Sequence, residues 1–181
     1  MSDEKILSVN DKDYRVINLL GKGKSGYSYL VADDKENRYV LKQIHHEPCE
    51  YYQFGDKLDA EIYAYNTLRS VGINIPELFE ADIQNERLLK EYIEGATVYD
   101  LILKNQMEDQ YVSQIKEMCG KLYAAGLNID YFPTNFVVKN DVLYYIDYEF
   151  NQYCEQWNFE NWGVIYWSKT DAFLKYASEH Q

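Results

Sequence analysis

Three side chains that could bind a metal ion and handle a proton lie in one stretch of the sequence, namely Asp130, Asn135 and Asp147. The residues between the last two are rich in β-forming types and are divided by a polar turn at 139–141, so residues 136–146 predict a hairpin. A hairpin folds its two ends back together, and we therefore expect Asn135 and Asp147 to lie side by side. Two oxygen-bearing side chains on rigid strand ends suit a hard divalent cation such as Mg²⁺. Asp130 would stand across from them as a free carboxylate.

The order of these residues resembles the catalytic loop of the protein-kinase-like superfamily. Its small members, such as the aminoglycoside-phosphotransferase-type kinases and the atypical serine/threonine kinases, carry the pattern H-x-D-x-x-P-x-N. Asp130, Pro133 and Asn135 match this pattern, while Asn128 replaces the histidine. Residues 122–127 also resemble the helix end that leads into that loop. The resemblance implies a minimal bacterial-type kinase with an α+β, two-lobed protein-kinase-like fold, in which Asp130 orients the attacking hydroxyl and the hairpin ends ligate Mg²⁺.

A glycine-rich loop at residues 21–26, with the sequence GKGKSG, joins two predicted strands. As a lone G-x-G-x-x-G pattern it could open a dinucleotide-binding fold, but that fold needs a helix straight after the loop. Its GKS triplet also suggests a Walker A loop, yet Asn18 stands where that motif needs glycine. A plain glycine-rich hairpin is a further alternative. The strand pattern favours the glycine flap of a kinase, whose backbone would cover the phosphates of ATP at Gly21, Gly23 and Gly26.

Lys42 lies in a third predicted strand at 38–44, and residues 56–71 form a helical pattern with Gly72 just past its end. Glu61 falls on the inward face of that helix, where a carboxylate should be paired because burying it alone is costly. The two positions match the lysine–glutamate ion pair of kinases, so the resemblance implies that Glu61 holds Lys42 against the α- and β-phosphates. The alternatives are a surface lysine on an edge strand and a glutamate at the rim of an amphipathic helix.

Residues 76–93 predict two more strands, and their end resembles the hinge that joins the two lobes of a kinase. The resemblance implies that backbone groups of Glu91 and Ile93 meet the adenine. Lys90 departs from the family pattern, because an apolar residue usually stands there at the back of the adenine pocket. An inward-pointing Lys90 would alter the pose of the nucleotide.

The second half of the chain is expected to be mainly helical, with a short helix at 97–104 and a longer one at 110–125. We therefore expect an N-lobe at 1–93, with the glycine loop, a five-stranded sheet and one helix. A reduced C-lobe at 94–181 would hold the catalytic loop, the metal-binding hairpin and the closing helices. One or two of these helices are expected to cover the core with aromatic residues, namely Trp157, Phe159, Trp162, Tyr166 and Trp167.

The composition limits which partners and which cellular compartment are expected. The 181 residues carry a net charge of −12, which argues against a nucleic-acid partner, because binding a phosphate backbone relies on Lys and Arg. No apolar stretch approaches the length of a membrane span, and no signal peptide is recognisable, so we expect a cytoplasmic protein with no membrane partner. Three widely spaced cysteines, Cys49, Cys119 and Cys154, fit neither a disulfide framework nor a zinc site and are predicted to be free thiols.

The motifs occur in the order found in kinases and favour an ATP- and Mg²⁺-dependent phosphotransferase that moves the γ-phosphate to a hydroxyl. The acceptor would be a serine or threonine of a protein, or a small alcohol. Only 34 residues follow Asp147, so we expect a protein partner to supply the docking surface. A pseudokinase that acts as a nucleotide-binding interaction module is an alternative, motivated by Asn128 and Lys90. An ATPase that serves a partner complex is another.

Overall fold

The computed structural model describes residues 5–48 and 56–180 of the chain. Cys49, one of the three predicted free thiols, lies outside the described residues. Cys119 and Cys154 are free cysteines, the first buried and the second exposed. Burial raises the pKa of the Cys119 thiol to about 11, so this side chain behaves as a small apolar core residue.

The chain forms two compact units. The first comprises residues 1–63 and 76–92, and the second comprises residues 64–75 and 93–181. The segment 64–75, which the sequence pattern assigns to the first lobe, thus groups with the second unit.

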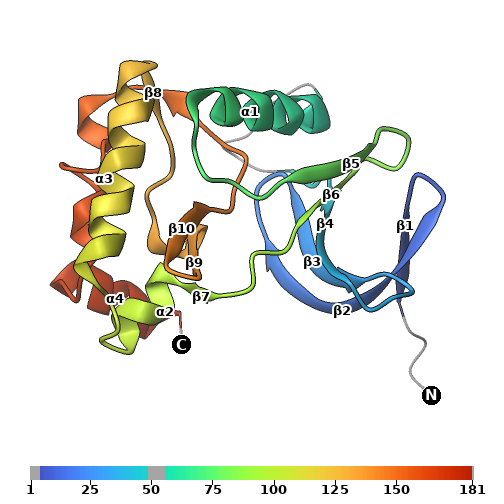
Figure 1. Cartoon of the computed structure of the whole chain (residues 1–181), viewed down its shortest axis with the longest axis horizontal. Coiled ribbons are helices and arrows are strands. Elements are labelled where there is room, and N and C mark those ends of the chain that lie inside the picture. The colour runs from blue at the N-terminus through green and yellow to red at the C-terminus, as the bar shows by residue number, and fades with distance from the viewer. Residues whose placement is uncertain (1–4, 49–55, 181) are drawn as a thin grey trace. The chain divides into compact units, whose positions relative to one another are not determined.

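The first unit is built on a six-stranded antiparallel sheet with the strand order β1-β2-β3-β4-β6-β5. Its strands are β1 (Ile6–Val9), β2 (Lys12–Lys22), β3 (Gly26–Ala32), β4 (Arg38–Ile44), β5 (Leu78–Asp82) and β6 (Arg87–Glu91). β1 at one end of this order contacts β5 at the other end, so the sheet curls into a half-barrel (Figure 1). Val31 and Leu41, both at 0% exposure, lie in the apolar core of this sheet.

The prediction of a five-stranded sheet is therefore wrong, because the sheet has six strands. β1 is short, and only Val9 among its residues is buried, so its apolar run is too weak to stand out. The turn that follows is more informative: Asn10 and Asp11 both have left-handed φ angles, of 45° and 66°. Asn and Asp tolerate that region, and a two-residue turn of this kind matches the twist of a hairpin.

Helix α1 (Lys57–Val71) occupies the position predicted from the apolar spacing. Leu58 and Leu68 are fully buried along its inward face. Gly72 ends the helix with a φ of +83°, a left-handed conformation that suits glycine because it lacks a Cβ atom.

The second unit holds two small sheets. A three-stranded sheet has the order β10-β9-β7, and a second pairs β8 with β11. The strands are β7 (Ala96–Thr97), β8 (Leu127–Asn128), β9 (Phe136–Lys139), β10 (Val142–Tyr145) and β11 (Asn151–Gln152). The hairpin expected at 136–146 is confirmed as β9 and β10, and its turn residues Asn140 and Asp141 have left-handed φ angles of 50° and 63°.

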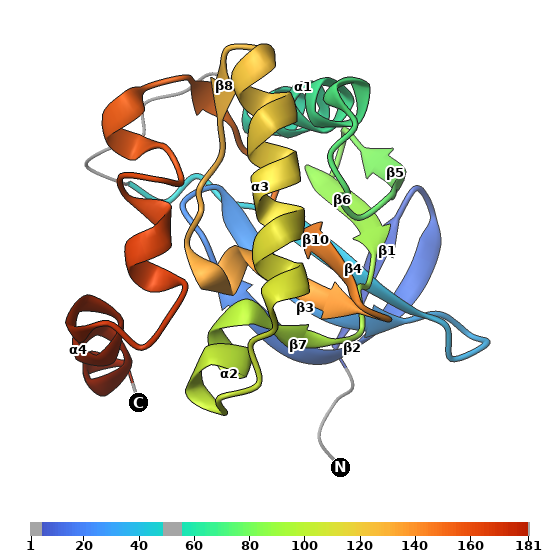
Figure 2. The ribbon, with the colours of Figure 1, turned by 60° about the vertical axis from the view of Figure 1, so that its left-hand side comes forward.

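Two helices of the second unit also follow the prediction. α2 (Val98–Leu103) begins at Thr97, whose side chain accepts a hydrogen bond from the backbone N–H of Asp100. α3 (Asp109–Ala124) runs alongside β8 and ends before Gly126, which has a φ of +72° (Figure 2). The buried face of α3 consists of Tyr111, Ile115, Met118, Cys119 and Leu122.

The last part of the second unit contains less α-helix than expected. Three 3₁₀ turns, η1 (Pro133–Asn135), η2 (Glu155–Trp157) and η3 (Gly163–Tyr166), precede helix α4 (Asp171–Glu179). Phe159 and Trp167 are buried in the core, and the indole N–H of Trp167 donates to the carbonyl of Tyr131 at 2.7 Å. Trp157 does not cover the core: it is 52% exposed, and its ring packs edge-on against that of Trp162.

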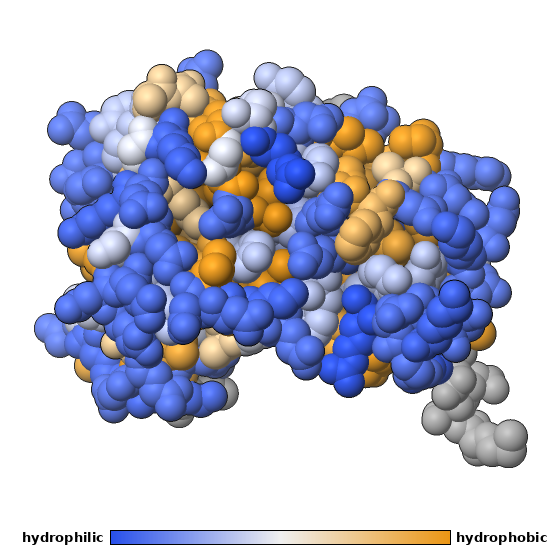
Figure 3. Space-filling model, in the orientation of Figure 1, coloured by the Kyte–Doolittle hydropathy of each residue, from blue (hydrophilic) through white to orange (hydrophobic). Residues whose placement is uncertain are grey.

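The fold class expected from the sequence, an α+β protein with a kinase-like antiparallel sheet in its first half, is confirmed. Hydrophilic residues dominate the face shown in Figure 3, in keeping with the net charge of −12. Within the described ranges, no helix has both the length and the apolar character needed to cross a membrane.

Candidate active site

The glycine-rich loop is a tight hairpin between β2 and β3. The backbone N–H of Gly23 donates to the carbonyl of Gly26 at 2.9 Å, which closes the turn. β3 follows directly, so the structure lacks the helix that a dinucleotide-binding fold or a Walker A loop requires at this point. Gly26 is buried, and a Cβ atom there would lie 2.5 Å from the carbonyl oxygen of Gln43. Gly21 and Gly23 are exposed and have room for a side chain.

The segment that follows β4 fastens this hairpin. The backbone N–H of His45 donates to the carbonyl of Ser25 at 3.0 Å, and the His45 ring contacts the carbonyl of Gly23 at 3.1 Å. Lys57 of α1 holds the same segment by donating to the carbonyl of His45 at 2.6 Å. Glu47 hydrogen-bonds to Lys22 at the base of the hairpin.

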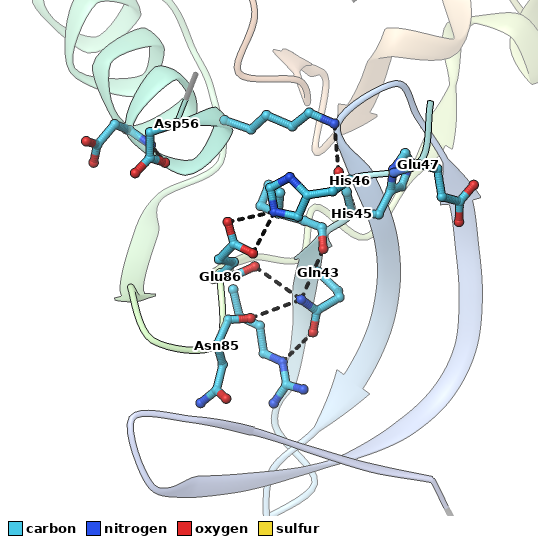
Figure 4. Close-up of polar contacts among 11 residues, drawn as sticks. Gln43, His45, His46, Glu47, Asp56, Asn85 and Glu86 are labelled. Atoms are coloured by element: carbon cyan, nitrogen blue, oxygen red, sulfur yellow. Dashed lines mark hydrogen bonds and ion pairs between the residues drawn. The ribbon is translucent and has the colours of Figure 1, made fainter. Parts of the chain in front are cut away.

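Figure 4 shows how this segment is tied to the sheet in turn. His46 faces Glu86, with ring-to-carboxylate distances of 2.8 and 2.9 Å. The side-chain amide of Gln43 donates to the carbonyl of Asn85 at 3.0 Å. The backbone of the glycine hairpin is therefore positioned by contacts that continue to the turn before β6.

Lys42 and Glu61 form a buried ion pair. Lys42 projects from β4 and Glu61 from α1, with 7% and 5% exposure, and the Lys42 ammonium bonds to Oε1 of Glu61. Ser25 of the glycine hairpin donates to the same oxygen at 2.7 Å. The other carboxylate oxygen, Oε2, is buried and has no hydrogen-bond partner among the described residues. The pairing of Lys42 with Glu61, which the sequence predicted, is thus present, and the role of Ser25 was missed.

The predicted hinge residues occupy the end of β6 and the segment after it. The backbone N–H of Glu91 already donates to the carbonyl of Glu77 at 2.8 Å, so that group is used within the sheet. Ile93 is buried. Lys90 is also buried, at 4% exposure, and lies opposite Val40 of β4 and Leu78 of β5.

The hairpin of the second unit brings the backbone of Asn135 next to that of Ile146, the residue before Asp147. The N–H of Ile146 donates to the carbonyl of Asn135 at 2.9 Å, one residue beyond the last strand pair, Phe136 with Tyr145. Both Asn135 and Asp147 are half-buried. Oδ1 of Asp147 accepts the backbone N–H of Tyr148 at 2.8 Å, which limits the rotation of the carboxylate.

Asp130 lies in the same unit and is exposed. Its Oδ1 accepts the backbone N–H of Phe132 at 3.0 Å, a local turn that holds the carboxylate. The side-chain amide of Asn135 donates to the carbonyl of Asp130 at 3.4 Å. The loop from Asp130 to Asn135 and the hairpin end at Asp147 therefore form one connected set.

Asn128, which replaces the histidine of the family pattern, has a structural role. It is buried at 3% exposure, and its amide donates to the carbonyl of Cys154 at 2.9 Å. Its backbone pairs with Asn151 in the two-stranded sheet. Asn128 thus anchors the start of the loop that carries Asp130.

Tyr145 is a second residue that the sequence reasoning missed. Its hydroxyl is buried beside the residues of this set and donates to the carbonyl of Glu149 at 3.0 Å. Burial, reinforced by the nearby carboxylates of Asp147, Asp130 and Glu149, raises the pKa of Tyr145 well above its ordinary value. The hydroxyl therefore stays protonated and remains a hydrogen-bond donor.

The donor set of the second unit fits a hard cation. The side-chain amide nitrogen of Asn135 donates a hydrogen bond to the carbonyl of Asp130. Its amide oxygen, the atom type that binds Mg²⁺, is not used in that bond. Asp147 adds a carboxylate fixed by a backbone hydrogen bond. No group of three or more His, Cys, Asp or Glu side chains able to hold a metal exists in the described part of the chain. One amide oxygen and one carboxylate match the one or two protein ligands that Mg²⁺ takes together with waters and phosphates.

No family model matches the chain, but several curated proteins do. The KEOPS complex subunit Bud32 of Pyrococcus abyssi is 31% identical over 83 residues, which cover 44% of this chain and 38% of that protein. A probable bifunctional tRNA threonylcarbamoyladenosine biosynthesis protein of Methanocaldococcus jannaschii is 30% identical over 142 residues, or 72% of this chain and 25% of that protein. The EKC/KEOPS complex subunit bud32 of Dictyostelium discoideum is 36% identical over 62 residues, covering 34% of this chain and 25% of that protein. In each case the match spans well under half the length of the relative.

Proposed function

The chain belongs to the protein-kinase-like superfamily, among its small atypical members, and we propose that it is an ATP- and Mg²⁺-dependent phosphotransferase. It would move the γ-phosphate of ATP to a hydroxyl group. Such a reaction needs positioned phosphates and neutralised charge more than covalent chemistry from the protein. The proposal requires that the residue sets of both units act on the same nucleotide.

In the first unit, the glycine hairpin would cover the phosphates through its backbone N–H groups, at Gly21, Gly23 and Gly26. Lys42 would contact the α- and β-phosphates while Glu61 keeps its ammonium in place. The carbonyl of Glu91 and the backbone of Ile93 would meet the adenine. For Glu91 the carbonyl is the group available, because its N–H is bonded to the carbonyl of Glu77.

In the second unit, Asn135 and Asp147 would hold Mg²⁺, which offsets the negative charge of the phosphates when it is bound. Asp130 would accept a hydrogen bond from the acceptor hydroxyl and orient its oxygen toward the γ-phosphate. The exposed position of Asp130 supports this role, since the acceptor must reach it from solvent.

The observation that carries the proposal is the buried pair of Lys42 and Glu61 beside the glycine hairpin. Burying two charges costs several kcal/mol per ion before their attraction is counted. Two apolar residues would serve stability at least as well, so the retained charges favour a role in binding a ligand.

The acceptor would be a protein serine or threonine or a small alcohol. Two of the relatives are named as complex subunits, which supports a protein partner for this chain. A second candidate is an ATPase that serves such a complex. A nucleotide-binding interaction module without transfer is a third. All three share the nucleotide site and differ only in the fate of the phosphate.

Nucleotide binding is tested by thermal unfolding with and without Mg-ATP. Nucleotide at about 100 times its Kd should stabilise the fold by about 2.7 kcal/mol. The shift should require Mg²⁺ and should weaken in Asp147→Ala. Glu117→Ala, which removes an exposed carboxylate from α3 of the same unit, is the matched control and should keep the full shift. No shift at millimolar nucleotide would exclude all three candidate functions.

The fate of the phosphate is tested with γ-labelled ATP. Label transferred to the protein itself or to an added alcohol or protein would identify a phosphotransferase, and Asp130→Asn should slow this transfer by about 10²- to 10⁴-fold. This substitution keeps an oxygen for the N–H of Phe132, so the loop should be preserved. Release of labelled phosphate without a labelled acceptor would favour the ATPase, and binding with neither outcome would favour the interaction module.

A further inference from the structure

The loop at residues 129–132, which carries Asp130, lies outside the helices and strands of the second unit. Such a loop has no ladder of backbone hydrogen bonds to fix it, so other contacts must set its position. The backbone N–H of Phe132 donates to Oδ1 of Asp130 at 3.0 Å, which orients the carboxylate from within the loop. Whatever holds Phe132 therefore also decides where the carboxylate of Asp130 points.

The Phe132 side chain is held by two tyrosine rings from η3 and α4. Its ring centroid lies 5.1 Å from that of Tyr166 in η3 and 4.6 Å from that of Tyr176 in α4. The ring planes are inclined at 56° and 65°. Aromatic pairs prefer inclined arrangements of this kind over face-to-face stacking at the same range of distances. Phe132 is thus fixed by directional contacts with residues more than thirty positions away in the sequence.

Tyr131, the residue between Asp130 and Phe132, is tied to the same part of the chain. Its carbonyl accepts the indole N–H of Trp167 at 2.7 Å, and the Trp167 side chain is buried in the core. Trp167 lies between η3 and α4. Both residues that follow Asp130 are therefore anchored to η3, to α4 or to the short segment that joins them.

Tyr176 is itself fixed before Phe132 packs against it. Helix α4 begins at Thr170, whose side chain accepts the backbone N–H of Phe173 at 3.2 Å, and Phe173 anchors the helix in the core at 0% exposure. The Tyr176 ring packs edge-on against Tyr99 of α2 at 6.0 Å and stacks on the His180 ring at 4.0 Å. Its position is therefore set by two helices and does not depend on the Asp130 loop.

The contacts of Phe132 lie at the rim of the core and not at its centre. Phe132, Tyr166 and Tyr176 are half-buried, whereas Phe159 and Phe173 are 1% and 0% exposed. Rings at the rim remove less apolar area from water and contribute less to folding than central ones. Their inclined packing still fixes an orientation, so this arrangement suits the positioning of a loop better than the stability of the unit.

We propose that Phe132 and Tyr176 are positioning residues, whose ring contact fixes the Asp130 carboxylate for the acceptor hydroxyl. Tyr176 acts through Phe132, and Phe132 acts through its backbone N–H. A carboxylate is planar, so fixing Oδ1 of Asp130 also sets the direction of Oδ2. This inference rests on the proposed function, because it assumes that Asp130 orients the acceptor. It adds that helix α4 controls the rate of phosphate transfer and leaves nucleotide binding unaffected.

The test is Tyr176→Ala, which removes the ring that Phe132 packs against. The loss of γ-phosphate from labelled ATP, counted for every acceptor including water, should slow by about tenfold to hundredfold at saturating Mg-ATP, as for a catalytic group misplaced by about 1 Å. The KM for ATP should stay unchanged, because the ring takes no part in binding it. Tyr176→Phe keeps the ring and should keep the wild-type rate. Leu174→Ala, which removes an exposed apolar side chain from the same helix, is the matched control and should also keep it.

The decisive measurement repeats this change without the carboxylate. In the Asp130→Asn background, Tyr176→Ala should slow the reaction no further, because residues that act as a unit are not additive. Equal slowing in both backgrounds would mean that Tyr176 serves only the fold and would overturn the proposal. A Tyr176→Phe variant as slow as Tyr176→Ala would overturn it as well. If Tyr176→Ala does not fold, Tyr176→Leu keeps much of the apolar volume and is measured in its place.

Backbone hydrogen exchange of the ligand-free protein gives a readout that does not depend on activity. Exchange of the Phe132 amide should speed up by about fivefold to tenfold in Tyr176→Ala, the effect of losing one hydrogen bond. Exchange in α3 should stay unchanged and serves as the measure of global folding. Unchanged exchange at Phe132 would show that Tyr176 does not hold the loop and would overturn the proposal.

The two proposals fail in different ways. If wild type loses no γ-phosphate from ATP, the proposed function fails, while exchange at Phe132 still shows whether Tyr176 holds the Asp130 loop. If wild type transfers phosphate and Tyr176→Ala transfers it at the same rate, the proposed function stands and the role of Tyr176 is refuted.

Discussion

The two sets of candidate residues are held in place by opposite means. Lys42 and Glu61 in the first unit are at most 7% exposed and are fixed by an ion pair between side chains. Asp130 in the second unit is exposed, and Asn135 and Asp147 are half-buried. Their positions come from backbone hydrogen bonds of a loop and a hairpin.

This difference predicts how function and stability are linked in each unit. A buried ion pair takes part in the fold, because removing one partner leaves the other charge without water and without compensation. Side chains on a scaffold of backbone bonds can be exchanged at little cost to folding. Substitutions in the first set should therefore affect both folding and nucleotide binding, whereas those in the second should affect nucleotide binding or phosphate transfer at little cost to folding.

The largest expected effect on stability is that of Glu61→Ala. It should lower the free energy of unfolding by about 3–5 kcal/mol, because it leaves the Lys42 ammonium buried without its carboxylate. Asp130→Ala is the matched change in the other unit and should cost about 1 kcal/mol or less, since its carboxylate is exposed and holds one local turn. Urea unfolding of both variants measures the contrast, and equal losses would contradict it.

A control separates the charge from the packing. In the double variant Lys42→Met with Glu61→Leu, both charges are replaced by apolar groups of similar size, which is often neutral or stabilising. We expect the double variant to recover most of the stability lost in Glu61→Ala but to show no thermal shift with Mg-ATP. Recovery of the nucleotide response would show that the pair is structural only.

The next effect in size comes from the glycine hairpin. Gly26→Ala should cost about 1–3 kcal/mol, because its Cβ atom would meet the backbone carbonyl of Gln43 at 2.5 Å and Cε of Lys42 at 3.3 Å. Gly21→Ala has no atom within 4 Å of the new Cβ and should be close to neutral. Thermal unfolding measures both, and the Mg-ATP shift should fall in the Gly26 variant, whose clash lies against Lys42. Similar behaviour of the two glycines would contradict this distinction.

Much of the fold could be predicted from local sequence. Apolar spacing with a glycine stop located α1 and α3, and the polar turn between two β-rich runs located the hairpin of Asn135 and Asp147. These signals act within one element, so they can be read without knowing the rest of the chain. β1 was missed because its run is short and little buried, although the Asn10-Asp11 turn pointed to it.

The pairing of Lys42 with Glu61 could also be predicted, because an inward-facing carboxylate needs a partner. Ser25 and Tyr145 could not, since their partners are set by tertiary contacts. The chain has 19 tyrosines, and nothing in the sequence marks the one whose buried hydroxyl donates to the carbonyl of Glu149, just after Asp147. Nor does the glycine pattern show that its serine bonds to a carboxylate of α1.

The smallest expected effect tests that serine, the contact that joins the hairpin to the buried pair. Ser25→Ala removes the donor that lies 2.7 Å from Oε1 of Glu61 and should lower the free energy of unfolding by about 1 kcal/mol, the net value of a typical hydrogen bond. It should also weaken Mg-ATP binding by about threefold to tenfold, because both the hairpin and Glu61 lose a constraint. Ser25→Thr keeps the hydroxyl and should restore both properties, as measured by thermal unfolding and a nucleotide titration. If the threonine variant matched the alanine variant, the serine would act through its size and not through its bond, and the glycine hairpin would be independent of the ion pair that it contacts.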